Sequence, residues 1–400
     1  MKIQFVDSIE KINRADWQAL VTSSCPFIQY DYFFALENSR SACAERGWQP
    51  HHLVVTDEQA QPKAIFPMYI KQHSWGEYVF DWAWAQAYER YQLPYYPKLV
   101  ASIPFTPVTS DKLLVNNLTS QLNLEQIFNE LSLYCQAHDL NSWHCLFITP
   151  NQLANNQSQQ VEPATIDATS NTPLADYYLR HTVQFHWVNR NYQTFDEYLT
   201  SFTARKRKNT KKERLSIEKQ GLLIEQLTGK QLTPKELDYF YLAYQLTYLK
   251  KGHQPHLTYQ FFEQIFNRFA DNILLVVASH EQRQERVACA LFFYDQDTLY
   301  GRYWGCSEQF NNLHFELCYY QGIEFCIQNK LTYFNPGTQG EHKIQRGFEP
   351  VLTHSYHWLK HAEFKPAIKA FCQQECQQMQ NYQKQCQQAL PFNAEHVTRR

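Results

Sequence analysis

The sequence predicts a mixed α/β protein of two consecutive domains, each with a mixed sheet flanked by helices. The chain has 400 residues, more than a typical single domain. Strand-like and helix-like segments alternate up to residue 150, and the alternation restarts after a polar stretch at residues 151–173. We therefore expect a first domain at 1–150, a linker or long loop at 151–173, a second domain at 174–370, and a glutamine-rich C-terminal helix or tail at 371–400.

Apolar runs and helical spacing predict the elements of the first half. Two apolar runs joined by a polar turn predict strands at residues 51–57 and 64–71. Residues 124–138 place Ile127, Leu131 and Tyr134 on one face of a helix. A buried strand is expected at residues 143–150.

The second half has a longer series of elements. Strands are expected at residues 184–190, 272–280, 286–295, 298–305, 331–334 and 354–359. Helices are expected from residue 194 to 221 and at residues 236–249, 257–270 and 313–328.

Composition excludes several classes of protein. A formal net charge of −2 argues against a general nucleic-acid coat, so any basic site must be local. The cysteine count of 11 is odd and includes no CxxC pair, which favours reduced thiols in a cytoplasmic protein. The N-terminus has no apolar core of a signal peptide, and no apolar run is long enough to span a membrane.

The densest charge run, at residues 205–214, has seven cations and one carboxylate. Thr194 and Glu197 have the spacing of a capping box, an apolar face follows, and Gly221 fits the end of the helix. A solvated helix face is one interpretation. However, seven like charges repel one another, and a polyanion would relieve that repulsion. The predicted phosphate-binding residues are Arg205, Lys206, Arg207 and Lys208.

Aromatic and acidic residues are mixed in residues 75–110. Packing in a core is one interpretation of so many rings. A carboxylate among rings is costly unless it is paired, so Asp81 either pairs with Arg90 or Lys98 or lines a cleft. The substrate-binding residues predicted here are Asp81, Trp82, Trp84, Glu89 and Tyr95.

A glycine-containing, charged loop at residues 335–350 follows the strand at 331–334. Arg302 and Lys343, at adjacent strand ends, suit an anionic group, and His342 or Glu316 suits a general base for an attacking amine. The alternative is a structural ion-pair network. Two histidines and two carboxylates occur here without HExxH spacing, so no metal is expected. The predicted catalytic residues are Lys343, His342, Glu316 and Glu341, and the predicted substrate-binding residues are Arg302, Tyr303, Trp304, His314 and Arg346.

Several long blocks carry a resemblance to a known family. They are EYVFDWAWAQAYERYQLPYYPKL, IPFTPVT, RKRKNTKKERLSIEKQGLLI, LYGRYWG, LHFELCYYQGI and PGTQGEHKIQRGF. The chain resembles the FemAB-like (peptidoglycan biosynthesis/recognition) branch of the GNAT acyltransferase superfamily over nearly its whole length. Lys343 stands where the conserved lysine of that family is expected.

The resemblance implies two tandem GNAT-like domains and attack by an amine on an activated acyl group. The implied donor is aminoacyl-tRNA, the implied acceptor is a cell-wall precursor or a small amine, and no tightly bound cofactor is implied. Residues 306–316 lack a glycine-rich pyrophosphate cradle, which counts against acyl-CoA as the donor. The helical hairpin that some family members use with tRNA is also absent, since residues 220–237 are too short to hold it. An acyl-CoA-dependent N-acetyltransferase and a non-catalytic precursor-binding protein remain the alternatives.

Overall fold

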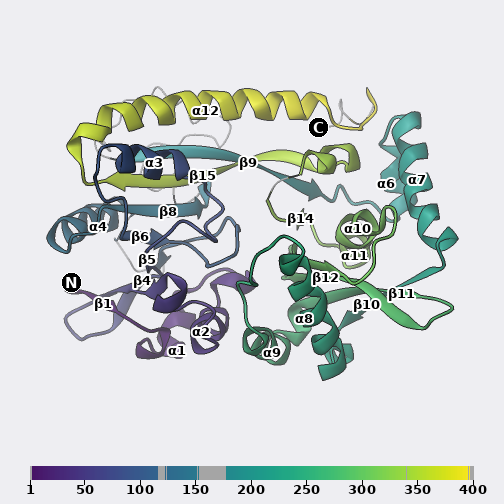
Figure 1. Cartoon of the computed structure of the whole chain (residues 1–400), viewed down its shortest axis with the longest axis horizontal. Helices are drawn as coiled ribbons and strands as arrows, with labels where there is room; N and C mark the ends of the chain where they lie inside the picture. Colours follow the sequence, from purple (N-terminus) through teal and green to yellow (C-terminus); the bar gives the residue numbers. More distant parts are fainter. Residues whose placement is uncertain are drawn as a thin grey trace. The chain divides into compact units, whose positions relative to one another are not determined.

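The computed structural model describes residues 2–115, 122, 124–150, 152, 177–338, 340–394 and 396. These residues form two compact units (Figure 1). Unit 1 contains Met1–Val183 and Leu352–Tyr382, and unit 2 contains Gln184–Val351 and Gln383–Arg400. Residues 352–370, expected in the second domain, belong to unit 1, a return that no local sequence pattern indicates. Apart from Gln152, the predicted linker at 151–173 lies outside the described residues.

Unit 1 contains two sheets. A four-stranded antiparallel sheet has the order β1 (Lys2–Val6), β3 (His52–Thr56), β4 (Pro62–Phe66), β7 (Leu114–Val115). In the other, the strands follow the order β2 (Trp48–Pro50), β5 (Tyr69–Lys71), β6 (Lys98–Ala101), β8 (Ser142–Ile148), β15 (Glu349–Leu359). The helices are α1 (Arg14–Leu20), α2 (Tyr30–Asn38), α3 (Trp82–Arg90), α4 (Leu124–Ala137) and most of α12 (Lys365–Gln388).

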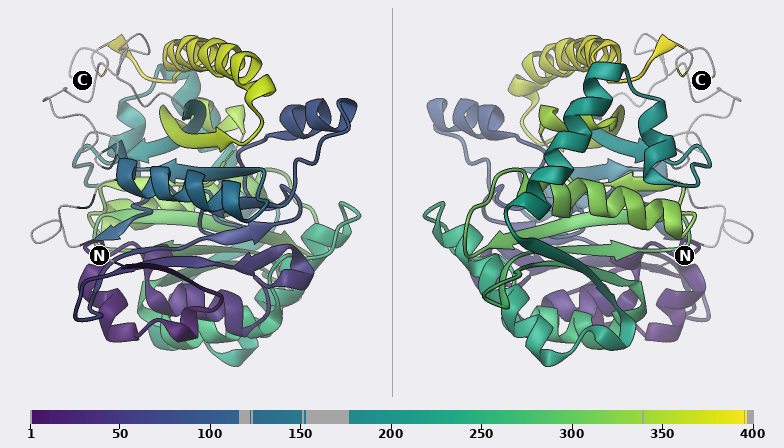
Figure 2. Two further views of the ribbon diagram at one scale, coloured as in Figure 1. Left: turned by 90° about the vertical axis from the view of Figure 1, so that its left-hand side faces the viewer. Right: turned by 90° about the vertical axis from the view of Figure 1, so that its right-hand side faces the viewer.

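Helix α4 packs on β8 (Figure 2, left). Its apolar face is buried, as its spacing predicts. Ile127 and Leu131 are buried in the core of unit 1, whereas Tyr134 is only partly buried. The ring of Trp143, on β8, lies 4.5 Å from the ring of Phe128 on the same helix and is tilted against it. The predicted strand at 64–71 is two strands, because β4 ends before Pro67 and β5 begins after it.

Unit 2 has one sheet in the order β10 (Leu222–Thr228), β11 (Ile273–His280), β12 (Glu285–Tyr294), β13 (Thr298–Cys306), β14 (Tyr333–Asn335), β9 (Tyr178–Val188). Its helices are α6 (Phe195–Thr200), α7 (Ala204–Lys219), α8 (Pro234–Leu249), α9 (Tyr259–Arg268), α10 (Leu313–Phe315) and α11 (Gln321–Gln328). Helix α8 packs on β12 and β13, and α11 packs on β13 and β14.

The two units share one strand pattern. In unit 1, β6 and β8 are parallel, and their outer neighbours β5 and β15 are antiparallel to them. In unit 2, β13 and β14 are parallel, and β12 and β9 are antiparallel to them. Both units thus have the mixed sheet flanked by helices that the sequence predicts for tandem GNAT-like domains.

Two predicted helices are interrupted. The helix expected from residue 194 to 221 is α6 followed by α7, with a break at Ser201–Thr203. Thr194 caps α6 by accepting from the Glu197 amide, and Gly221 ends α7 with a φ of 68°, as expected. The helix expected at 313–328 consists of α10, a π-helical turn at Glu316–Tyr320, and α11.

Candidate functional site

Lys343 lies on a short 3-10 helix, Glu341–Arg346, which follows β14 in unit 2. Gly340 and Gly347 flank this helix with φ values of 99° and 78°, a conformation that favours glycine. A Cβ at Gly347 would lie 2.1 Å from the Tyr198 hydroxyl. Glycine at position 347 therefore allows the helix that carries Lys343 to end against α6.

The amine of Lys343 is buried without a counter-charge. Lys343 is 2% exposed, and its Nζ donates to the carbonyl oxygens of Gly337 at 2.8 Å and Thr338 at 3.1 Å. No carboxylate among the described residues pairs with it. Burial, assisted by the nearby Arg302 guanidinium, lowers the pKa of Lys343 to about 7. At neutral pH the amine can therefore either donate or accept a proton.

Two other nitrogen-bearing side chains, Arg302 and His186, lie near enough to Lys343 to interact with it electrostatically. Arg302, on β13, donates to the carbonyl oxygen of Gly301 at 2.6 Å. Burial lowers the pKa of His186, on β9, to about 3, and the charges of Lys343 and Arg302 add to the effect. His186 is therefore neutral and close to both cations. Sequence reasoning misses His186, because the segment QFHWVNR indicates only a strand.

Arg346 connects the 3-10 helix to α7. Its NH1 donates to the carbonyl oxygen of His342 and its NH2 to Glu213 Oε2, both at 2.8 Å. Its guanidinium carbon lies 3.5 Å from the centroid of the Phe315 ring. Its own carbonyl oxygen accepts from the Tyr198 hydroxyl at 2.7 Å. Arg346 was predicted to bind substrate. Its contacts instead favour a structural role, in which Arg346 positions the 3-10 helix.

Glu316, expected as a general base, is held in an ion pair. Arg214 NH2 lies 2.9 Å from its Oε1, and Gln321 Nε2 donates to the same oxygen at 2.8 Å. Arg214 also pairs with Glu324 at 2.7 Å. Both partners of Arg214 lie on the segment from the π-helical turn to α11, so this arrangement fits the structural ion-pair network that the sequence left open.

The remaining predicted residues near Lys343 are mostly held by ring contacts. His342 Nε2 lies 2.8 Å from the Tyr319 hydroxyl. Burial lowers the pKa of His314 to about 4, and its ring meets Trp304 edge to face at 5.2 Å. Tyr303 belongs to an aromatic cluster with α8 and α9, and Glu341 is exposed.

Helix α7 (Figure 2, right) carries both exposed cations and side chains that bind the 3-10 helix of Lys343. Lys206 hydrogen bonds Gln345 of the 3-10 helix, and Glu213 binds Arg346. Arg205 and Lys208 are exposed and Arg207 is partly exposed, and none of the three has a carboxylate partner among the described residues. Three of the four predicted phosphate-binding side chains, all except Lys206, are thus available on the helix that contacts the Lys343 segment.

In unit 1, Asp81 pairs with Lys98 and not with Arg90. Lys98 Nζ also donates to Glu77 Oε2 at 2.8 Å, and the Tyr95 hydroxyl donates to Asp81 at 2.6 Å. Burial raises the pKa of Glu77 to about 7 and lowers that of Lys71, directly opposite Lys98 on β5, to about 6. The structure therefore places two of the predicted substrate-binding residues in a buried charge network.

The other predicted residues of unit 1 lie on α3. Trp84 is 2% exposed, and the Arg180 guanidinium carbon lies 4.8 Å from its ring. Trp82 is partly buried and meets Trp75 edge to face at 5.4 Å. Glu89 is exposed, so it is not brought into the charge network.

Comparison with known proteins decides the family. Residues 8–394 match the FemAB-like family, described as peptidoglycan biosynthesis/recognition. The chain belongs to the FemAB-like family. This membership supports an acyl- or aminoacyltransferase, with peptidoglycan-related partners. A search of curated proteins finds no match.

Solved structures similar to the FemAB-like chain have low identity. A conserved protein of unknown function from Bacteroides thetaiotaomicron is 11% identical, with a TM-score of 0.49 over 90% of this chain and 100% of that one. FemX is 12% identical, with a TM-score of 0.49 over 92% and 100% of the respective chains. L-PGS from Bacillus licheniformis is 9% identical, with a TM-score of 0.47 over 86% and 96%.

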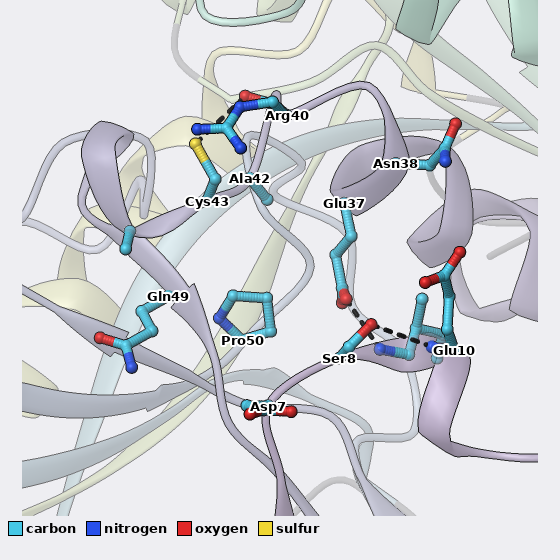
Figure 3. Close-up of a pocket in the computed structure, with 12 residues that line it drawn as sticks. Asp7, Ser8, Glu10, Glu37, Asn38, Arg40, Ala42, Cys43, Gln49 and Pro50 are labelled. Atoms are coloured by element: carbon cyan, nitrogen blue, oxygen red, sulfur yellow. Dashed lines mark hydrogen bonds between the residues drawn. The ribbon is translucent and has the colours of Figure 1, made fainter.

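Unit 1 of the FemAB-like chain also contains a cavity. This cavity, of about 380 Å³, is lined by Asp7, Glu37 and Arg40, among other residues, and by none of the predicted site residues (Figure 3). The Glu37 carboxylate is engaged there, since it accepts from the Ile9 amide at 2.8 Å and contacts His52 at 2.7 Å.

Among the described residues, no group of three or more His, Cys, Asp or Glu side chains is placed to hold a metal, and no helix is long and apolar enough to cross a membrane. All 11 cysteines are free thiols.

Proposed function

We propose that this FemAB-like chain is an amide-forming acyl- or aminoacyltransferase whose reaction takes place at Lys343. The proposal rests on the burial and the lowered pKa of the Lys343 amine. This amine is buried, has no carboxylate partner among the described residues, and has a pKa lowered to about 7. Such an amine suits proton transfer at neutral pH, because its pKa lies near the working pH.

The chemistry follows from the two protonation states of Lys343. The nitrogen of an acceptor amine bonds to the acyl carbon of the donor, and the bond from that carbon to the donor's leaving oxygen breaks. Neutral Lys343 takes the proton that the attacking nitrogen loses, and the lysine then returns it to the leaving oxygen. Two carbonyl oxygens, of Gly337 and Thr338, hold the amine, so a further N–H of the charged form remains for the developing oxyanion.

Aminoacyl-tRNA is the favoured donor, because the exposed cations of α7 suit a phosphate backbone. Lys206 links that helix to Gln345, two residues from Lys343. The proposed acceptor is a peptidoglycan precursor or a small amine, in keeping with the family description. No tightly bound cofactor is part of the proposal. A cytoplasmic location is part of it, because charged tRNA is found there.

Thermal melts with four separate additives test the donor and the acceptor: charged tRNA, uncharged tRNA, acetyl-CoA and a UDP-linked muropeptide. A ligand that binds only the native state raises the midpoint. We expect charged tRNA to stabilise the protein more than uncharged tRNA does. A shift with acetyl-CoA alone would overturn the tRNA donor, and a shift with the muropeptide alone would favour a recognition protein.

A transfer assay with Lys343→Ala tests the chemistry. We expect turnover to fall by about 100-fold or more, with a smaller effect on ligand affinity. Lys112→Met is the matched control. Lys112 is also a buried lysine, whose Nζ donates to Ser110 Oγ at 2.6 Å, but it lies in unit 1. Equal losses in the two variants would show that Lys343 matters only for the fold.

A further inference from the structure

Several buried side-chain nitrogen atoms in unit 1 lack a hydrogen-bond partner among the described residues, and three of them lie on neighbouring side chains. These three are Arg180 NH1, Trp84 Nε1 and His357 Nε2. Arg180 is 4% exposed, Trp84 2% and His357 1%. Most buried polar groups in proteins are hydrogen bonded, because a buried donor without a partner has lost its hydration without replacement. Three such atoms on neighbouring side chains therefore require an explanation.

Trp84 contacts both of the other side chains. The Trp84 and His357 rings meet edge to face at 5.2 Å, and the Arg180 guanidinium carbon lies 4.8 Å from the Trp84 ring. The other nitrogens of Arg180 are engaged, because Nε and NH2 bind Glu375 at 2.7 and 2.6 Å. NH1 is thus held in place beside the indole by a fixed guanidinium.

His357 ends a chain of hydrogen bonds. Its Nδ1 lies 2.6 Å from His144 Nδ1, and His144 Nε2 lies 2.9 Å from the Ser142 hydroxyl. Burial lowers the pKa of both histidines well below the usual value, so both rings are neutral and one proton lies between the two Nδ1 atoms. His357 Nε2 is therefore either protonated, and can donate a hydrogen bond, or unprotonated, and can accept one.

The surroundings of His357 favour an anion. Besides burial and His144, the charges of Arg180 and Lys98 lower the pKa of His357. Carboxylates offset part of these charges, since Arg180 pairs with Glu375 and Lys98 pairs with Asp81 and Glu77. An anion at Nε2 would require the donating tautomer of His357. His144 Nδ1–H then donates to His357, and Ser142 donates to His144.

We propose that Arg180, Trp84 and His357 form a buried binding site for a carboxylate group. Two carboxylate oxygens can share three N–H donors, and one of these donors belongs to the guanidinium, which matches carboxylates well. A singly charged group fits better than a phosphate dianion, because Glu375 already offsets the charge of Arg180. The carboxylate can come from a free small acid or from the C-terminus of a peptide. The site is separate from the proposed reaction at Lys343 and does not depend on it.

The indole N–H resonances in a nitrogen-15 NMR spectrum of the full chain test this site. The resonance of Trp84 is assigned with Trp84→Phe. The probes are acetate for a free acid, N-acetylalanine for a peptide terminus, and inorganic phosphate, all at matched ionic strength. Trp17 and Trp143 are internal controls, because their indoles donate to the Ile28 carbonyl at 3.0 Å and to Ser132 Oγ at 2.9 Å.

We expect a saturable change of the Trp84 resonance in the millimolar range. If the Trp84 resonance changes with acetate, the ligand of the site is a free acid. If it changes with N-acetylalanine alone, the ligand is the C-terminus of a peptide. His357→Phe and Arg180→Lys should each weaken binding about tenfold or more, while unchanged Trp17 and Trp143 resonances show that the variants are folded. No saturable change with either carboxylate, or tighter binding of phosphate, would overturn the proposal.

Discussion

Arg346 NH2 lies 2.8 Å from Glu213 Oε2, so the helix that carries Lys343 is joined to the basic helix α7 by an ion pair. The Arg346 side chain is buried, and the same Glu213 oxygen accepts from the Tyr320 hydroxyl. The single carboxylate in the charge run 205–214 is therefore a structural anchor for the Lys343 segment. The outer cations of α7 remain available for a partner.

Glu213→Gln should destabilise the protein by about 1–3 kcal/mol, because it leaves the buried Arg346 guanidinium without its carboxylate. Urea unfolding measures this change. Glu218→Gln, an exposed position on the same helix, is the control and should change stability by less than about 0.5 kcal/mol. Equal effects at the two positions would contradict the anchoring role of Glu213.

Elements with clear periodicity could be predicted from the sequence. Helix α9 buries Phe261, Phe262 and Ile265 at helical spacing, and β11 is an almost continuous apolar run. The break between α6 and α7 could not be predicted, because distant residues stabilise it. The Thr203 amide donates to the Pro391 carbonyl at 2.9 Å, and the Asn393 amide donates to the Ser201 carbonyl at 2.8 Å.

The candidate site could be predicted only in part, because contacts between residues distant in the sequence determine the rest of it. Lys343 stands in a motif that the sequence displays. An ion among aromatic rings needs a partner, so the sequence predicts Arg90 or Lys98 for Asp81, or a cleft, and the structure shows Lys98. Glu316 was expected as a base, but Arg214 pairs with it across about a hundred residues. His186 lies in a strand, and only the tertiary fold brings it close to Lys343.

Lys343→Met should stabilise the protein at pH 6 by as much as about 5 kcal/mol, while it abolishes proton transfer. The pKa of Lys343 is about 7 in the folded state and about 10.5 unfolded. Below pH 7 the buried charge is fully present and costs stability. Between pH 7 and 10.5 the unfolded chain binds more protons, so wild-type stability rises with pH relative to the variant. Urea unfolding at pH 6 and pH 9 measures the difference, and an unchanged difference would contradict the lowered pKa.

Lys98→Met should destabilise the protein by about 3–5 kcal/mol at pH 8, because Asp81 and Glu77 would lose their buried cation. Without that cation both carboxyl pKa values rise, so protonation at pH 5 should reduce the loss. Lys71→Met is the matched control on the facing strand. The Lys71 amine is 3.9 Å from Glu77, and the variant should cost less than about 1.5 kcal/mol. Comparable losses by thermal or urea unfolding would show that the two lysines share the carboxylates equally.

Substitution of Arg205, Arg207 and Lys208 by glutamine should weaken tRNA binding without loss of stability, because these side chains are at least partly exposed and have no carboxylate partner among the described residues. Each lost phosphate contact reduces the dependence of log affinity on log salt, so we expect the slope to fall by about 2. Fluorescence anisotropy with labelled tRNA across a salt series measures it. The matched control replaces Lys230, Lys235 and Lys251, which are exposed cations elsewhere in unit 2. Because both triple variants lower the net charge by the same amount, an equal fall in slope would mean that binding follows net charge and not the cations of α7.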